Sequence, residues 1–340
     1  MLDITKIKQI DKEQMFEMYN QWPIIAESSF NKKYEQVNYK GIEHIVFSGM
    51  GGSGAIGDVL EAILSKTDIH VSVIKGYLLP NTVNEKTLVV TTSVSGNTIE
   101  TLTVLEQAFK KKTKILALSS GGKMEDFCKC NNIEFRKIEK FHSPRCSLTS
   151  FLYSMLNILK PIIPISEETI IESIEELKII KNKISTDNLT IKNPSLSLAM
   201  WIKNIPLIYY PNGLQSAAIR FKNSLQENAK QHTIIEDVVE ATHNGIVAWE
   251  KNTGIQPILL KGKDDYIKTK ELWKVLEEFF KVKKIGCKEI ISPEGNILTK
   301  LISLIYILDY CTIYKAILSD IDPTPVSSIE FFKEKFKHKN

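Results

Sequence analysis

The chain has 340 residues, enough for one large α/β domain or two smaller ones that each bury a core. Its 44 basic and 40 acidic side chains leave a formal charge of only +4, spread along the chain except for a lysine-rich end at residues 333–339. This balance gives no reason to expect a nucleic-acid partner.

The cysteines and the apolar segments predict a protein of the cytoplasm. The five cysteines are odd in number and lack the paired spacing of a zinc site, so free thiols are expected. Charged residues occur every few positions from the start of the chain, which leaves no apolar signal core. The most apolar stretch, residues 301–314, contains Asp309 and is too short to span a bilayer, so no membrane partner is expected.

The first half of the chain alternates strands with helices. Residues 1–40 are expected to form a helical extension, and a β-then-α rhythm follows it. Alternation at this pitch predicts a parallel, doubly wound sheet over residues 41–165. Strands are expected at residues 44–50, 70–74, 88–92 and 113–118, and helices at 55–66, 100–112 and 149–159.

A charged, helical run at residues 166–183 predicts a connector over 166–190, after which a second rhythm begins. The expected fold is therefore α/β, with two subdomains that each hold a doubly wound, mostly parallel sheet flanked by helices. The second subdomain is expected to span 191–340. Its strands are expected at residues 205–210, 255–260 and 289–291, and a helix at 217–230.

A glycine-rich loop, Gly49-Met-Gly-Gly-Ser-Gly54, lies between a predicted strand and a predicted helix. Glycines let the backbone approach an anion, and the helix start supplies oriented N–H groups. A dinucleotide site would also need an acidic residue after the next strand, where Lys75 and Gly76 occur instead. A sugar phosphate, a nucleotide and a plain turn remain open for this loop alone.

A second loop, Ser93-Val-Ser-Gly-Asn-Thr98, also lies between a strand and a helix and offers three hydroxyls. Hydroxyls and backbone N–H groups suit a compact phosphate. The alternative is ordinary capping, with Asn97 or Ser95 as the cap and Glu100 completing a capping box. Two such loops on one sheet edge favour a phosphate ligand.

At these two loops the sequence resembles the sugar isomerase (SIS) domain family, whose strand-to-helix loops bind phosphosugars. More narrowly, it resembles the bifunctional phosphoglucose/phosphomannose isomerases. The segments that carry this resemblance occur in order: Ser143-Pro-Arg145, Gln226-Glu-Asn-Ala-Lys230, Glu240-Ala-Thr-His-Asn244 and Asp322-Pro-Thr-Pro-Val-Ser-Ser-Ile-Glu-Phe-Phe-Lys333.

The resemblance implies a role for each matching residue. Arg145 would stabilise the enediolate, and Glu227 would be the base that moves the proton between C2 and C1. His243 would assist ring opening, reaching the neighbouring subunit's site in a homodimer with shared active sites, and Lys333 would complete the pocket near the ring oxygen. The phosphate would be bound by Gly52, Ser53, Ser93, Ser95 and Thr98.

The expected reaction interconverts glucose 6-phosphate, and mannose 6-phosphate as well, with fructose 6-phosphate through a cis-enediol. No cofactor and no metal are expected. One departure concerns mannose: some relatives have a threonine seven positions before the C-terminal lysine, where this chain has Val326, flanked by Thr324 and Ser327. The preference between the two aldoses is therefore open.

Without the resemblance, the same residues have ordinary explanations. The helix at 217–230 is expected to bury one apolar face and to expose Arg220, Asn223, Glu227 and Lys230 on the other. Two other classes of function are also open. A phosphosugar sensor would keep the loops but would not need Glu227, His243 and Lys333, and an NAD-dependent oxidoreductase would need the acidic residue that is missing.

Overall fold

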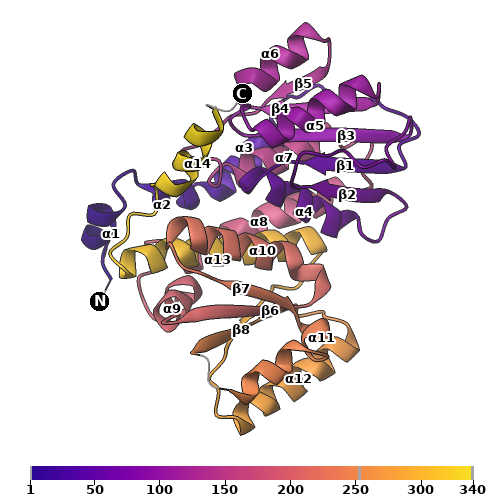
Figure 1. The fold of residues 1–340 in the computed structure, drawn as a ribbon. Coiled ribbons are helices and arrows are strands. Elements are labelled where there is room, and N and C mark those ends of the chain that lie inside the picture. The colour runs from indigo at the N-terminus through magenta and orange to yellow at the C-terminus, as the bar shows by residue number, and fades with distance from the viewer. Residues whose placement is uncertain (1, 252–253, 338–340) are drawn as a thin grey trace.

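Two parallel sheets organise the chain, and a layer of helices lies between them (Figure 1). A computed structural model describes residues 2–251 and 254–337. The first sheet has five strands in the order β2-β1-β3-β4-β5, and the second has four in the order β7-β6-β8-β9. All neighbouring strands are parallel, which confirms the predicted fold class. The strands are β1 (His44–Ser48), β2 (His70–Ile74), β3 (Thr87–Ser93), β4 (Lys114–Ser119), β5 (Glu134–Lys137), β6 (Ile205–Tyr210), β7 (Ile234–Asp237), β8 (Ile255–Lys261) and β9 (Lys288–Ile291).

Side-chain alternation divides the first sheet into an inner and an outer face. Phe47 and Val90 point to the inner face, where they join the core formed with α4 (Gly52–Leu64), α7 (Leu148–Ile158) and α3 (Trp22–Asn31). Val46 and Val89 point outward and pack with α5 (Ile99–Lys110) and α6 (Gly122–Cys130). Both faces are covered, as expected for a doubly wound sheet.

The second sheet is layered in the same way. Ile208 and Leu260 face inward to α9 (Pro194–Trp201), α10 (Gln215–Asn228) and α13 (Ile297–Leu318). Tyr209 and Leu259 face outward, where they pack with α11 (Val238–Ala241), the 3-10 turn η2 (Gly245–Glu250) and α12 (Ile267–Val282). A second short turn, η1 (Asn212–Leu214), precedes α10.

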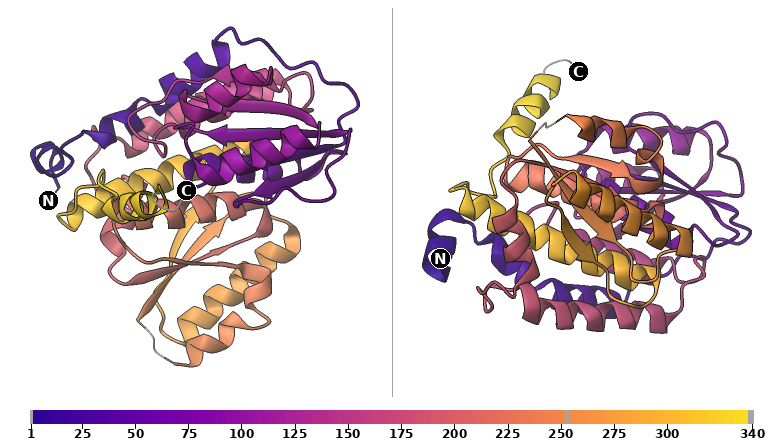
Figure 2. Two further views of the ribbon diagram at one scale, coloured as in Figure 1. Left: turned by 45° about the horizontal axis from the view of Figure 1, so that its top comes forward. Right: turned by 90° about the horizontal axis from the view of Figure 1, so that it is seen from below.

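The inner layers of the two subdomains form one continuous hydrophobic core. Helix α13 lies in the middle of the molecule, between the two sheets (Figure 2), and packs against α8 (Glu167–Ile184), α9 and α10. The connector expected at 166–190 thus contains a core helix. Because the core is shared, the division into separate domains at 41–165 and 191–340 stays a prediction. Residues 338–340 of the second predicted domain lie outside the described structure.

Helix α13 is longer than the apolar stretch expected at residues 301–314. The apolar stretch is not too short to span a bilayer, because the helix runs for 22 residues from Ile297 to Leu318. Most of its apolar residues are buried by neighbouring helices of the same chain, so the packing explains the composition.

Short helices lie near the start of the chain, and a longer helix lies near its end. Helices α1 (Ile4–Ile10) and α2 (Met15–Asn20) lie at one end of the shared layer. The last helix, α14 (Ser327–Lys337), projects from the body (Figure 2). It leaves three apolar side chains on one side largely exposed: Ile329, Phe332 and Phe336 at 40%, 61% and 52%.

Candidate functional site

Both predicted phosphate loops lie at the carboxyl edge of the first sheet. The first follows β1 and opens α4 at Gly52, and the second follows β3 and opens α5 after Thr98. Neither N-cap residue, Gly51 or Thr98, makes a side-chain capping hydrogen bond. The first-turn N–H groups of two helices are therefore directed toward the same edge, an arrangement that favours an anion.

The capping explanation of the second loop is wrong. The N-cap of α5 is Thr98, and the Glu100 carboxylate accepts a hydrogen bond from Tyr77 Oη at 3.2 Å instead of closing a capping box. The Ser95 hydroxyl accepts from the Asn97 N–H at 3.3 Å, within the loop itself.

The predicted phosphate ligands fall into two groups by burial. Ser53 and Ser93 are buried, and their hydroxyls hold the loops together: Ser53 Oγ accepts from the Val94 N–H at 3.2 Å, and Ser93 Oγ lies 2.9 Å from Thr98 Oγ1. Ser95 is exposed and Thr98 is half-buried. Ser95 and Thr98 are thus the hydroxyl residues of this set that a ligand can reach.

Gly52 brings the first loop against the segment that carries Arg145. A Cβ at Gly52 would lie 3.1 Å from the Pro144 carbonyl oxygen and 3.4 Å from Arg145 Cα. Even the methyl group of alanine at this position would require the loop or that segment to shift. The phosphate loops and the predicted cation therefore share one edge.

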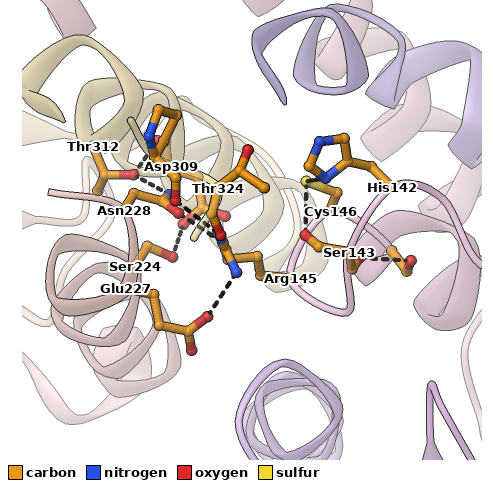
Figure 3. Close-up of polar contacts among 12 residues, drawn as sticks. His142, Ser143, Arg145, Cys146, Ser224, Glu227, Asn228, Asp309, Thr312 and Thr324 are labelled. Atoms are coloured by element: carbon orange, nitrogen blue, oxygen red, sulfur yellow. Dashed lines mark hydrogen bonds and ion pairs between the residues drawn. The ribbon is translucent and has the colours of Figure 1, made fainter. Parts of the chain in front are cut away.

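Arg145 is buried, with 5% of its surface exposed, and is held by four partners (Figure 3). Its Nε donates to Asn228 Oδ1 at 2.7 Å, and its Nη2 donates to the carbonyl oxygens of Pro323 and Thr324, each at 2.8 Å. Its Nη1 donates to Glu227 Oε2 at 3.4 Å. Of its five N–H groups, one on Nη1 has no acceptor among the described residues.

The carboxylate of Glu227 faces this guanidinium from the last turn of α10 (Figure 3). Its side chain is 26% exposed, so part of it is accessible to a ligand. A carboxylate beside a buried cation combines a proton acceptor with a group that stabilises negative charge. The nearby Cys146 thiol is not a competing nucleophile, because burial raises its pKa to about 11.

Helix α10 departs from the predicted two-faced helix. Its apolar face is buried as expected, but Arg220 is also buried, with 2% exposed. Burial alone would lower the pKa of Arg220, and the charge of Asp309 raises it above its ordinary value. Ser224 and Asn228 lie on the same side of the helix and are buried too. The expected exposed position of Arg220 is therefore wrong, because α13 supplies it with a partner.

His243 and Lys333 do not join Arg145 and Glu227 within one chain. His243 is exposed in the turn after α11, in the outer layer of the second sheet, whereas Glu227 lies on α10 in the inner layer. Lys333 is exposed on α14. The structure thus assembles the two phosphate loops, Arg145 and Glu227, and leaves two predicted residues at the surface.

Family models match most of the chain. The description "SIS domain" matches residues 39–156, and "Bacterial phospho-glucose isomerase C-terminal SIS domain" matches 191–336. A bifunctional phosphoglucose/phosphomannose isomerase of Caldicellulosiruptor bescii is 32% identical, over 94% of this chain and 98% of the relative. The enzyme of the same name from Aquifex aeolicus is 30% identical, over 88% of this chain and 91% of the relative.

Among solved structures, the C-terminal domain of glucosamine-fructose-6-phosphate aminotransferase from Francisella tularensis superposes with a TM-score of 0.69. The match covers 91% of this chain and 96% of that structure, at 15% identity. At this identity the likeness concerns the fold alone.

Proposed function

The chain belongs to the bifunctional phosphoglucose/phosphomannose isomerases, and on this premise we propose how its residues interconvert glucose 6-phosphate with fructose 6-phosphate. The enzyme is an aldose–ketose isomerase, and mannose 6-phosphate is its proposed second aldose. The observation that carries the mechanism is the Glu227 carboxylate at 3.4 Å from Arg145 Nη1, with Arg145 lying against Gly52 of the glycine-rich loop.

The phosphate of the substrate binds where the two helix starts meet. Ser95 and Thr98 donate hydroxyl hydrogen bonds, and backbone N–H groups come from the first turn of α5 and from Gly52 at the start of α4. The N–H groups of Ser53 and Gly54 already donate to the Met50 carbonyl oxygen. Gly52 lets the first loop lie against the segment that carries Arg145, while the Ser53 and Ser93 hydroxyls hold the loops in place. This anchoring fixes C1 and C2 of the open-chain sugar near Glu227.

Glu227 removes the proton from C2 of the aldose, and the electrons of that C–H bond move into a C1–C2 double bond. Negative charge develops on the O1 and O2 side, where Arg145 stabilises it through the Nη1 N–H that has no protein acceptor among the described residues. The hydroxyl proton passes from O2 to O1, and Glu227 returns its proton to C1. The product is the ketose, and the enzyme is restored to its starting state.

Ring opening is assigned to His243, which reaches the site of the neighbouring subunit in a homodimer, and Lys333 is placed near the ring oxygen. The exposed position of His243 in the outer layer of the second sheet supports a shared active site, because a second copy of the chain can receive an exposed residue into its own site. The exposed apolar side of α14 supports burial against another chain. The cytoplasmic location stays a prediction.

The test is conversion of fructose 6-phosphate without added cofactor in D₂O, with glucose 6-phosphate and mannose 6-phosphate quantified separately. A proton transfer through an enediol places solvent deuterium on the carbon that receives it, whereas a direct hydride shift does not. Glu227→Gln is expected to lower kcat by about 10²–10⁴-fold with little change in substrate affinity. Glu250→Gln, at an exposed acidic residue on η2, is the matched control.

Each result has a defined meaning. Tight binding of fructose 6-phosphate without turnover would indicate a sensor, and turnover that requires NAD would indicate an oxidoreductase. Near-normal turnover by Glu227→Gln would remove Glu227 from the mechanism. The ratio of the two aldose products measures the substrate preference that Val326 leaves open.

A further inference from the structure

A buried ion pair lies behind the predicted cation of the site. Arg220 Nη2 lies 2.6 Å from Asp309 Oδ2, and the exposed fractions of the two side chains are 3% and 0%. Arg220 Nε also donates to both carboxylate oxygens of Asp309. Asp309 is the acidic residue that interrupts the apolar sequence of α13.

A contribution to stability does not by itself explain why a buried ion pair is present at this position. Removing two charges from water is costly, and apolar residues of similar volume often fill the same space with no loss of stability. Here Arg220 Nη2 makes one further contact, donating to the Arg145 carbonyl oxygen at 2.7 Å. The pair therefore fixes the main chain at the residue whose side chain faces Glu227.

A second set of contacts leads from the same helix to the Arg145 side chain. Thr312 lies one turn after Asp309 on α13, and its hydroxyl accepts from Asn228 Nδ2 at 2.8 Å and donates to the Asp309 carbonyl at 2.6 Å. Held in this orientation, Asn228 presents Oδ1 to Arg145 Nε at 2.7 Å. Figure 3 shows Thr312, Asn228 and Arg145 in this sequence of contacts.

The partners on α10 share one side of that helix. Arg220, Ser224 and Asn228 are spaced at i, i+4 and i+8, and Ser224 Oγ donates to Asp309 Oδ1 at 2.7 Å. Glu227 is adjacent to the last of them. The same helix turn therefore holds Arg145 and carries the carboxylate that faces it.

We propose that Asp309, Arg220 and Thr312 are positioning residues of the isomerase: Asp309 acts through Arg220 on the main chain of Arg145, and Thr312 acts through Asn228 on its guanidinium. This inference rests on the proposed function. None of the three touches the substrate. Together they set the separation between Arg145 and Glu227, so their loss displaces the cation from the developing enediolate.

The test compares two variants that remove the contacts without leaving a buried charge. The double variant Arg220→Met/Asp309→Leu replaces the ion pair by apolar side chains, and Thr312→Val keeps the shape of its side chain while removing the hydroxyl. The double variant is expected to lower kcat about 100-fold, and Thr312→Val about 10-fold, with KM changed less than about twofold. Affinity for 5-phosphoarabinonate, whose carboxylate resembles the enediolate, is expected to fall in parallel with kcat.

Tyr153→Phe is the control for a structural role alone. It removes a buried hydrogen bond of 2.8 Å to Ser173, between α7 and α8, and is expected to lower the melting temperature without changing kcat. Folding of each variant is checked by circular dichroism and melting temperature. If the double variant does not fold, the kcat and inhibitor affinity of Thr312→Val test the proposal.

The proposal is overturned if the folded variants keep kcat and 5-phosphoarabinonate affinity within about threefold of the wild-type values. Failure of the wild-type enzyme to isomerise fructose 6-phosphate would instead contradict the proposed function. The two failures are therefore distinguishable in one set of assays.

Discussion

Replacing Arg145 by lysine keeps the positive charge and changes only how it is held. The guanidinium of Arg145 donates to Asn228, Glu227 and the carbonyls of Pro323 and Thr324 in four different directions. A lysine ammonium is a single point of charge on a flexible stem and does not reproduce this fork. If two of the four hydrogen bonds are lost at about 1 kcal/mol each, the free energy of unfolding falls by about 2 kcal/mol.

The effect on catalysis is expected to be larger than the effect on stability. Loss of a well-placed donor to a developing oxyanion lowers kcat by about 10²–10³-fold, and KM should change little because the charge develops only in the transition state. The assay is steady-state conversion of fructose 6-phosphate alongside urea denaturation. Arg136→Lys is the control, since Arg136 makes a comparable set of contacts on β5 with Glu35 and Glu134. A kcat for Arg145→Lys within about threefold of the wild-type value would refute the reasoning.

Three further predictions concern the loops and the histidines. Ser95→Ala with Thr98→Ala should chiefly raise KM, because the phosphate is bound alike in the ground and transition states; unchanged affinity for inorganic phosphate would contradict the loop assignment. His243→Ala should lower turnover of fructose 6-phosphate more than that of the shorter erythrose 4-phosphate, which lacks the hydroxyl for a stable ring, and equal losses would exclude a ring-opening role. The pKa of His44 is lowered by burial and by neighbouring His70, so the unfolded chain binds more protons than the folded one. Stability should therefore fall as the pH drops below about 6.5, the ordinary histidine value, and His44→Gln should weaken this dependence in urea titrations at several pH values.

Long, strongly patterned elements were predictable from the sequence, and short polar ones were not. The buried run of β3 and the glycine-rich turn after β1 carry their signals locally. By contrast, β5 and β7 have four residues each and read Glu-Phe-Arg-Lys and Ile-Ile-Glu-Asp, too short and too polar to show a period. Helix α12 was missed although Trp273, Leu276 and Phe280 follow helical spacing, so in that case the signal was present.

The site shows a similar division. Arg145 and Glu227 were identified through the resemblance, and the structure brings them together from segments 82 positions apart. The burial of Arg220 could not be predicted from α10 alone, because a polar stripe at i, i+4 and i+8 has the same pattern whether it faces water or a polar partner. The informative signal was Asp309 within an apolar helix, since an acidic residue in such a position requires a partner.

Arg145 also contacts the connection between α13 and α14. Its Nη2 donates to the carbonyls of Pro323 and Thr324, which lie just before α14, so the path of the backbone between α13 and α14 is set by the same side chain that faces Glu227. An insertion or deletion between positions 319 and 326 would displace those carbonyls and release two donors of Arg145. Surface connections usually tolerate insertions and deletions. In the connection between α13 and α14, evolution should select against such changes in length.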